Sequence, residues 1–209
     1  MSAWSPATGS TKTVCPHVDG GRDWMPSSLD AASKILYMPW VEACMDLVPV
    51  AKGERGSLTT GVRWTVRPRE GTDGKYGRME AINVETGKSV WVMRQRAPVT
   101  SGVLATAGGL VFVGGLDRMF SAYDAQTGTP LWSARLNEVP ASVPITYSAG
   151  NQQYIATIVG GGGSQSTAYA TLVPEIRNPT NRAATIWVFQ ASTATSSGGA
   201  NRPRAAISR

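Results

Sequence analysis

The sequence lacks the features that mark several protein classes. None of its 209 residues belong to an apolar run of 18, which excludes a membrane-spanning helix. Charged residues make up only 16%, too few for a coiled coil or a disordered polyelectrolyte. Residues 1–14 contain no apolar segment of the signal-peptide kind, so we interpret them as an N-terminal lead-in. A globular fold is the class that remains.

Cysteine and histidine are scarce as well. Cys15 and Cys44 have no C-x-x-C spacing and His17 is the only histidine, so we predict no zinc or other metal site in this chain. Counting alone leaves open whether the cysteines are free thiols or one disulfide. The net charge is +6, but the arginines are scattered and form no nucleic-acid-binding motif. We therefore expect a solvated basic surface and no nucleic-acid partner.

Short β-strand signals, in contrast, are abundant. Runs rich in Val, Ile, Tyr and Trp alternate with Gly, Asp, Asn and Thr, and no segment of helical length has helical periodicity. We predict strands near 34–40, 62–66, 77–84, 89–95, 110–115, 119–125, 130–136, 153–160 and 185–190, and a hairpin turn at 149–151. Residues 191–209 are small, polar and basic, which predicts a disordered tail. The fold class is therefore all-β.

An internal repeat predicts the architecture. The segment AINVETGKSVW at 81–91 returns as AYDAQTGTPLW at 122–132. The matched pairs are Ala81 and Ala122, Asn83 and Asp124, Gly87 and Gly128, and Trp91 and Trp132, each 41 residues apart. A period near 40 in an all-β chain is typical of a β-propeller with one four-stranded antiparallel blade per repeat.

The residue types of the repeat have physical reasons. Asn or Asp opens the hairpin turn by accepting backbone N–H groups, and Gly supplies the positive φ that closes it. The Trp is expected to pack between neighbouring blades, where its indole N–H needs an acceptor. The pattern covers residues 25–190, about three to four blades. Because open sheet edges invite aggregation, we expect a partial propeller that other blades complete.

Two stretches then resemble one family. TSGVLATAGGLVFVGGLDRMFSAYDAQTGTPLW at 100–132, followed by VPITYSAGNQQYIATIVGGGG at 143–163, resembles the C-terminal blades of quinoprotein alcohol dehydrogenases. CPHVDGGRDWMPSSLDAASKILYMPWVEACMDL at 15–47 is similar to the family segment C-P-x-x-x-G-G-x-N-W-x-P, then Y-x-P and C-M-D. The resemblance implies an eight-bladed propeller, of which residues 15–190 would be blades. It also implies pyrroloquinoline quinone (PQQ) with calcium or a lanthanide, a cytochrome c type electron acceptor and a periplasmic location.

The resemblance implies a disulfide. Cys15 and Cys44 occupy the places of two cysteines that are bonded in methanol dehydrogenase-like members. Such a bond would close a loop of about 30 residues and implies an oxidising compartment.

The resemblance also implies cofactor contacts. Asp23 stands where the family has an Asn that reaches toward the quinone, so an acceptor-only carboxylate replaces an amide donor. Trp24 follows it. Thr100 and Ser164 stand where the family has two Trp that line the active-site cavity. Asp23, Trp24, Thr100 and Ser164 are therefore the candidate cofactor-binding residues, and no catalytic residue is assigned.

Two functional hypotheses follow. The family's catalytic Asp, its metal ligands and its vicinal cysteines lie in earlier blades, so we expect this chain alone neither to bind PQQ tightly nor to oxidise alcohols. The first hypothesis is a C-terminal or split portion of a PQQ-dependent alcohol dehydrogenase, joined by N-terminal blades from the same or a separate chain. The alternative is a catalytically inactive propeller remnant that serves as a binding or assembly scaffold. The closeness of the motifs favours the first, and the departures at Asp23, Thr100 and Ser164 favour the second.

Overall fold

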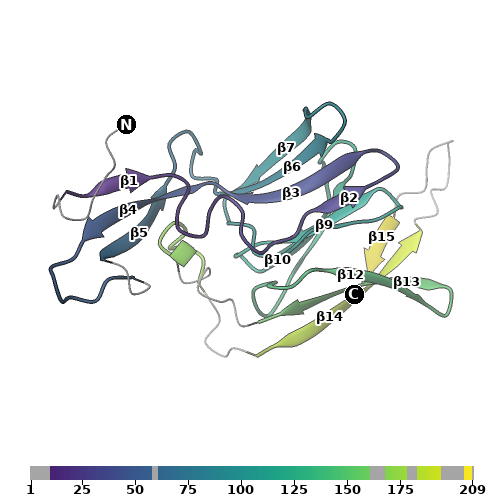
Figure 1. Cartoon of the computed structure of the whole chain (residues 1–209). Coiled ribbons are helices and arrows are strands. Elements are labelled where there is room, and N and C mark those ends of the chain that lie inside the picture. The colour runs from purple at the N-terminus through teal and green to yellow at the C-terminus, as the bar shows by residue number, and fades with distance from the viewer. Residues whose placement is uncertain (1–9, 58–60, 161–167, 178–182, 194–204, 209) are drawn as a thin grey trace.

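The computed structural model describes residues 10–57, 61–160, 168–177, 183–193 and 205–208. In these ranges the chain is built from antiparallel β-sheets, apart from short helical turns such as the one at 168–169 (Figure 1). No helix in the described ranges is long and apolar enough to cross a membrane. The predicted all-β class is confirmed.

Three four-stranded sheets form consecutive blades. Blade one contains, in spatial order, β2 (Ser28–Asp30), β3 (Ile35–Val41), β6 (Gly77–Asn83) and β7 (Ser89–Gln95). Blade two contains β8 (Leu104–Ala105), β9 (Leu110–Gly114), β10 (Met119–Asp124) and β11 (Pro130–Arg135). Blade three contains β12 (Ile145–Ala149), β13 (Gln152–Val159), β14 (Thr185–Thr193) and β15 (Ala205–Ser208). The sheets form an open arc rather than a closed ring (Figure 1).

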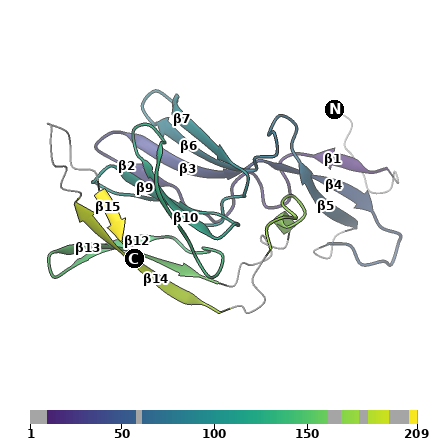
Figure 2. The same ribbon diagram turned by 180° about the vertical axis from the view of Figure 1, so that it is seen from behind.

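A fourth, three-stranded sheet is inserted into blade one. It contains β1 (Lys12–Val14), β4 (Ala43–Pro49) and β5 (Val62–Pro68), in the order β1-β4-β5. The chain leaves β3 through Glu42 and enters β4 directly, so the insertion extends away from the blades (Figures 1 and 2). The implied disulfide is confirmed, because Cys15 and Cys44 are bonded, with their Cα atoms 4.3 Å apart. It ties the segment after β1 to the start of β4.

The repeat packs the blades together as predicted. Trp91 on β7 lies opposite Ala81, and Trp132 on β11 lies opposite Ala122, and in both pairs the register shifts at the next residue. Both indoles contact the following blade. The Trp91 Nε1 donates to the carbonyl of Ala125 at 2.9 Å, and the Trp132 ring meets Phe189 edge-on with centroids 5.0 Å apart.

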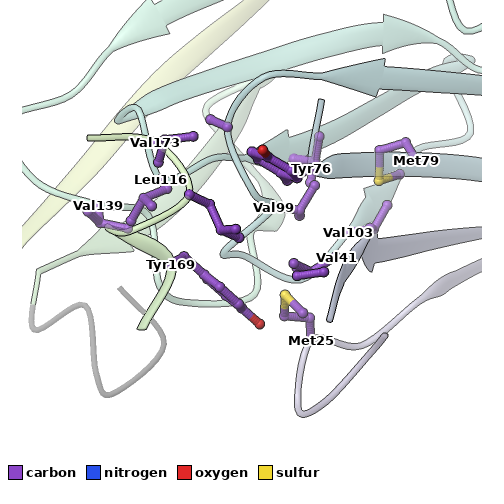
Figure 3. Close-up of a cluster of buried hydrophobic side chains, with 14 of the residues drawn as sticks. Met25, Val41, Tyr76, Met79, Val99, Val103, Leu116, Val139, Tyr169 and Val173 are labelled. Atoms are coloured by element: carbon purple, nitrogen blue, oxygen red, sulfur yellow. The ribbon is translucent and has the colours of Figure 1, made fainter. Parts of the chain in front are cut away.

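Two hydrophobic clusters fill the spaces between blades. The first joins blades one and two and includes Tyr169, Leu172 and Val173 from the segment after β13, which crosses back toward blade one (Figure 3). The second joins blades two and three around Phe120 and Phe189. The segment 168–176 therefore connects the last blade to the first.

Each of the nine predicted strands is present, but the prediction missed several short ones. β1, β2 and β8 have three, three and two residues, too few for a pattern to show. The disordered tail predicted for 191–209 does not hold where the chain is described: β14 extends to Thr193, and β15 pairs with its edge. Strand pairing satisfies backbone groups without requiring apolar side chains, which explains the difference. Residues 194–204 and 209 of that tail, like residues 1–9 of the lead-in, lie outside the described ranges.

Candidate functional site

The loops that precede the first strand of each blade contact one another. The Val103 N–H donates to the Pro26 carbonyl at 3.1 Å, which joins the loops before β8 and β2. The Gly102 N–H donates to the Ser142 carbonyl at 3.3 Å, which joins the loop before β12. A Cβ on Gly102 would lie 2.9 Å from Pro26 and 3.1 Å from Val143, so this junction requires glycine. The structure thus brings together the segments that carry Asp23, Trp24 and Thr100.

Thr100 is a structural residue of this junction. Its side chain is buried, and its hydroxyl donates to the Pro140 carbonyl at 2.8 Å. Its backbone N–H donates to the Gly114 carbonyl at 3.0 Å. The neighbouring Ser101 hydroxyl donates to the Gly102 carbonyl and accepts the Gly114 N–H, both at 2.7 Å. The Thr100 hydroxyl is therefore already engaged in joining blades two and three.

Asp23 and Trp24 are on the surface instead. Trp24 is 44% exposed, and Asp23 next to it is exposed as well. The fourth candidate, Ser164, lies outside the described ranges. The candidate cofactor residues therefore divide into two surface side chains and one buried side chain, and their roles toward a cofactor stay predictions.

A buried His–Tyr pair anchors the loop that carries Asp23. The His17 Nε2 lies 2.8 Å from the Tyr169 hydroxyl, and the His17 Nδ1 accepts the backbone N–H of Asp19 at 3.0 Å. An accepting Nδ1 places the proton of the neutral ring on Nε2, which then donates to Tyr169. Burial lowers the pKa of His17, against the opposing effect of the Asp19 and Asp23 carboxylates. Burial likewise raises the pKa of Tyr169 well above its usual range.

Sequence reasoning did not identify this pair. The two residues are 152 positions apart, and a single histidine carries no pattern that names its partner. The pair nevertheless holds the loop after Cys15, which leads to Asp23, against the segment at 168–176.

The described residues do not by themselves fit PQQ. The Thr100 hydroxyl is bound to the Pro140 carbonyl, and Asp23 offers only an acceptor that has the same charge sign as the carboxylates of the quinone. Within the described ranges, no three His, Cys, Asp or Glu side chains gather in a way that could hold a metal ion.

Comparison with known proteins decides the family. Residues 2–155 match the family model described as PQQ: glucose/ethanol/alcohol dehydrogenase, β-propeller domain. The chain belongs to this family. Two bacterial relatives support the assignment. Quinoprotein alcohol dehydrogenase PedE of Pseudomonas putida is 32% identical over 88% of this chain and 30% of its own length. The lanthanide-dependent methanol dehydrogenase of Methylacidiphilum fumariolicum is 33% identical over 78% of this chain and 27% of its own length.

Solved structures of this quinoprotein family have the same fold. A europium-containing methanol dehydrogenase superimposes with a TM-score of 0.71 at 26% identity, covering 86% of this chain and 35% of that one. The resemblance to quinoprotein alcohol dehydrogenases is therefore confirmed. The chain spans about 30% of the length of the curated relatives it matches.

Proposed function

We propose that this chain forms the C-terminal part of the propeller of a PQQ-dependent alcohol dehydrogenase, and that further blades on the same or another chain complete it. The completed protein would oxidise an alcohol to an aldehyde and pass the electrons to the quinone. The family membership supports the reaction class, and the coverage of about 30% of the relatives supports the need for further blades.

The main support for this proposal is a turn on blade one against which no Trp side chain packs in the described chain. On blade two, the turn at 124–129 receives Trp91 from blade one. The indole N–H donates to the Ala125 carbonyl, and the six-membered ring lies 2.8 Å from where a Cβ on Gly128 would be. Gly128 has a φ of 71°, and its N–H donates to the Asp124 carbonyl. The turn thus presents a flat, glycine-lined surface and a carbonyl to an indole.

The turn at 83–88 of blade one has the same geometry. The Asn83 side chain accepts the N–H groups of Glu85 and Thr86, as Asp124 does on blade two. Gly87 has a φ of 68°, and its N–H donates to the Asn83 carbonyl. Within the described chain, however, no atom lies within 4 Å of a Cβ built on Gly87. Blade one therefore offers the same indole-binding turn to a further blade.

The opposite end of the arc is also open. One face of blade three packs on blade two through Ile155 and Phe189. The other face carries large apolar side chains that are 40–67% exposed, namely Ile145, Tyr147, Ile158, Ile186 and Val188. A contiguous apolar sheet face of this kind marks an interaction surface. It supports a second docking blade at this end.

The proposal assigns this chain a limited chemical role. Its loops at 23–26, 99–103 and 140–143 would form part of the wall around the cofactor, and the metal ligands and catalytic base would come from the other blades. The proposal also includes a periplasmic location. The periplasm is an oxidising compartment, in which a disulfide such as that between Cys15 and Cys44 persists. A cytochrome c type protein would accept the electrons.

A docking measurement tests the proposal. The chain is mixed with a polypeptide that carries the earlier blades of PedE, and association is followed by sedimentation velocity. Gly87→Ala places a methyl group where the incoming indole would pack, so we expect roughly tenfold weaker association, about 1.4 kcal/mol. Gly71→Ala is the matched control, because Gly71 has a φ of 75° and equally open surroundings but lies outside the repeat. Absence of association, or equal effects of both variants, would contradict the proposal.

A non-catalytic scaffold is the second candidate function, and the site geometry favours it at two positions. Asp23 replaces an amide donor with a carboxylate, and the Thr100 hydroxyl is bound to the Pro140 carbonyl. An assembled propeller that fails to bind PQQ would support the scaffold, whereas one that binds it would support the dehydrogenase.

A further inference from the structure

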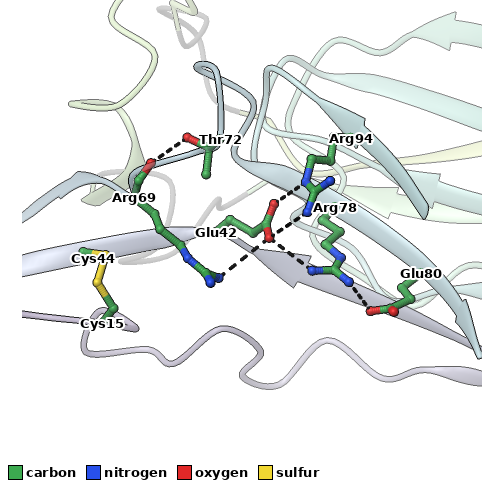
Figure 4. A network of polar contacts seen from close by, with 8 residues as sticks. All are labelled: Cys15, Glu42, Cys44, Arg69, Thr72, Arg78, Glu80 and Arg94. Atoms are coloured by element: carbon green, nitrogen blue, oxygen red, sulfur yellow. Dashed lines mark hydrogen bonds and ion pairs between the residues drawn. A yellow bond between two sulfur atoms is a disulfide. The ribbon is translucent and has the colours of Figure 1, made fainter. Parts of the chain in front are cut away.

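A groove with charged and apolar side chains in its walls lies beside the disulfide, where β3 crosses into β4. Its volume is about 500 Å³, and its walls include Cys15, Gly21, Trp40, Arg69 and Glu80. Figure 4 shows the charged side chains that surround it, which come from the β3–β4 crossover, β6, β7 and the end of β5. Asp23, Trp24 and Thr100 do not line this groove.

The two carboxylates at the groove are already neutralised. Glu42 accepts from Arg94 at 2.7 and 3.3 Å and from Arg78 at 3.2 Å. Burial disfavours its charged form, but the hydrogen bonds from Arg94 and Arg78 outweigh burial and lower the pKa of Glu42. Glu80 accepts from Arg78 at 2.6 Å and also from the Ser89 hydroxyl. Both carboxylates therefore have arginine donors before any ligand arrives (Figure 4).

Donors remain in excess after these pairings. The Arg69 guanidinium lies 3.7 Å from Glu42, beyond hydrogen-bond reach, and its side chain is 55% exposed. Two further N–H groups, the Nε of Arg78 and the Nε1 of Trp40, are buried without an acceptor in the described chain. A buried donor without an acceptor costs free energy, and a ligand that supplies an acceptor removes that cost. The ion-paired cluster contains three arginines and two glutamates, and the Asp73 carboxylate also acts electrostatically on Arg94.

We propose that this groove is a binding site for a small oxyanion, a carboxylate or phosphate compound, held by Arg69 together with the unpaired N–H groups of Arg78 and Trp40. Guanidinium groups bind carboxylate and phosphate through paired, charge-assisted hydrogen bonds, and the exposed Arg69 has its donors available for such a pair. The site is separate from the loops proposed to face the quinone, and it does not depend on the proposed dehydrogenase function.

The experiment titrates the whole chain with two probes. Isothermal calorimetry measures the binding of succinate and of inorganic phosphate, with neutral succinamide as the uncharged comparison. We expect one of the two anions to bind and succinamide not to bind. The stronger of the two responses identifies whether the natural ligand is a carboxylate or a phosphate compound.

Two variants locate the site, and one controls for charge. Arg69→Ala should weaken binding about tenfold or more without lowering the melting temperature, because its guanidinium makes no hydrogen bond in the described chain. Trp40→Phe should weaken binding about threefold, since it removes one N–H and keeps an aromatic ring. Arg63→Ala is the control, because Arg63 is an exposed arginine on β5 whose ion pair with Glu54 lies away from the groove. The Arg63→Ala variant should bind the anion with the same affinity as the unmodified chain.

Two results would overturn the proposal. The first is the absence of measurable binding of either anion at millimolar concentration. The second is an equal loss of binding in Arg69→Ala and Arg63→Ala, which would show that the anion responds to net charge and not to the groove.

Discussion

Gly128 offers a sharp test of how the blades are held together. In the isolated chain, Gly128→Ala places a methyl group 2.8 Å from two atoms of the Trp91 indole, at a φ of 71°. The left-handed backbone alone costs about 1 kcal/mol for a residue with a Cβ. The indole must also move away from the Ala125 carbonyl, to which it donates at 2.9 Å, and overpacking of this kind costs about 1–3 kcal/mol more.

Gly87→Ala is the internal control for that prediction. Gly87 has almost the same φ, 68°, but open space around its Cβ position in the described chain. We therefore expect Gly87→Ala to lose only the backbone contribution, about 1 kcal/mol, and Gly128→Ala to lose about 2–4 kcal/mol. Urea denaturation followed by tryptophan fluorescence measures both. Equal losses in the two variants would refute the idea that Trp91 and the 124–129 turn join the blades.

Three further predictions concern other contacts. Acid should destabilise the chain through His17, because folding lowers the pKa of this side chain. The unfolded state therefore takes up the proton at a higher pH than the folded state, and the free energy of unfolding should fall as the pH drops below about 6.5. Urea unfolding midpoints recorded between pH 7.5 and 5.5 measure this effect. If the midpoint of His17→Gln depended on pH as steeply as that of the unmodified chain, the result would contradict the prediction. Reduction of the Cys15–Cys44 bond should cost roughly 3–4 kcal/mol in the chain-entropy model, checked by denaturation with and without reductant; a loss below about 1 kcal/mol would contradict it. Phe120→Ala should cost about 3–5 kcal/mol because its buried ring lies 5.8 Å from that of Phe189, and calorimetry showing an unchanged melting temperature would disprove this packing.

The blade architecture could be predicted from the sequence because the same hairpin motif, which is a weak signal when it occurs once, occurs twice. One Asn/Asp-x-x-Thr-Gly turn followed by a Trp is an ordinary hairpin, but two copies 41 residues apart predict blades. Trp91 and Trp132 lie where the repeat places them. Strands such as β8 could not be predicted, since two residues carry no alternation. The three-stranded insertion was missed for another reason: β3 runs into β4 through Glu42 without a turn signal.

The candidate site was less accessible. Motif matching placed Thr100 near the predicted cofactor, but the sequence does not show that its hydroxyl is bound to the Pro140 carbonyl, 40 residues away. The bonds between Glu42 and Arg94 join residues 52 positions apart, and no local pattern predicts such a pairing. Charged groups of this kind are brought together by strand order, which only the folded chain reveals.

The central claim is that this open arc becomes a quinone site only when other blades complete it. Its most direct test is a calorimetric titration of PQQ, with and without calcium, into the chain alone and into its mixture with the earlier blades of PedE. We predict no tight binding by the chain alone and binding by the mixture, because the chain alone leaves the cofactor exposed to solvent on one side. Sub-micromolar affinity for the chain alone, or no binding by a mixture that has assembled, would contradict the claim.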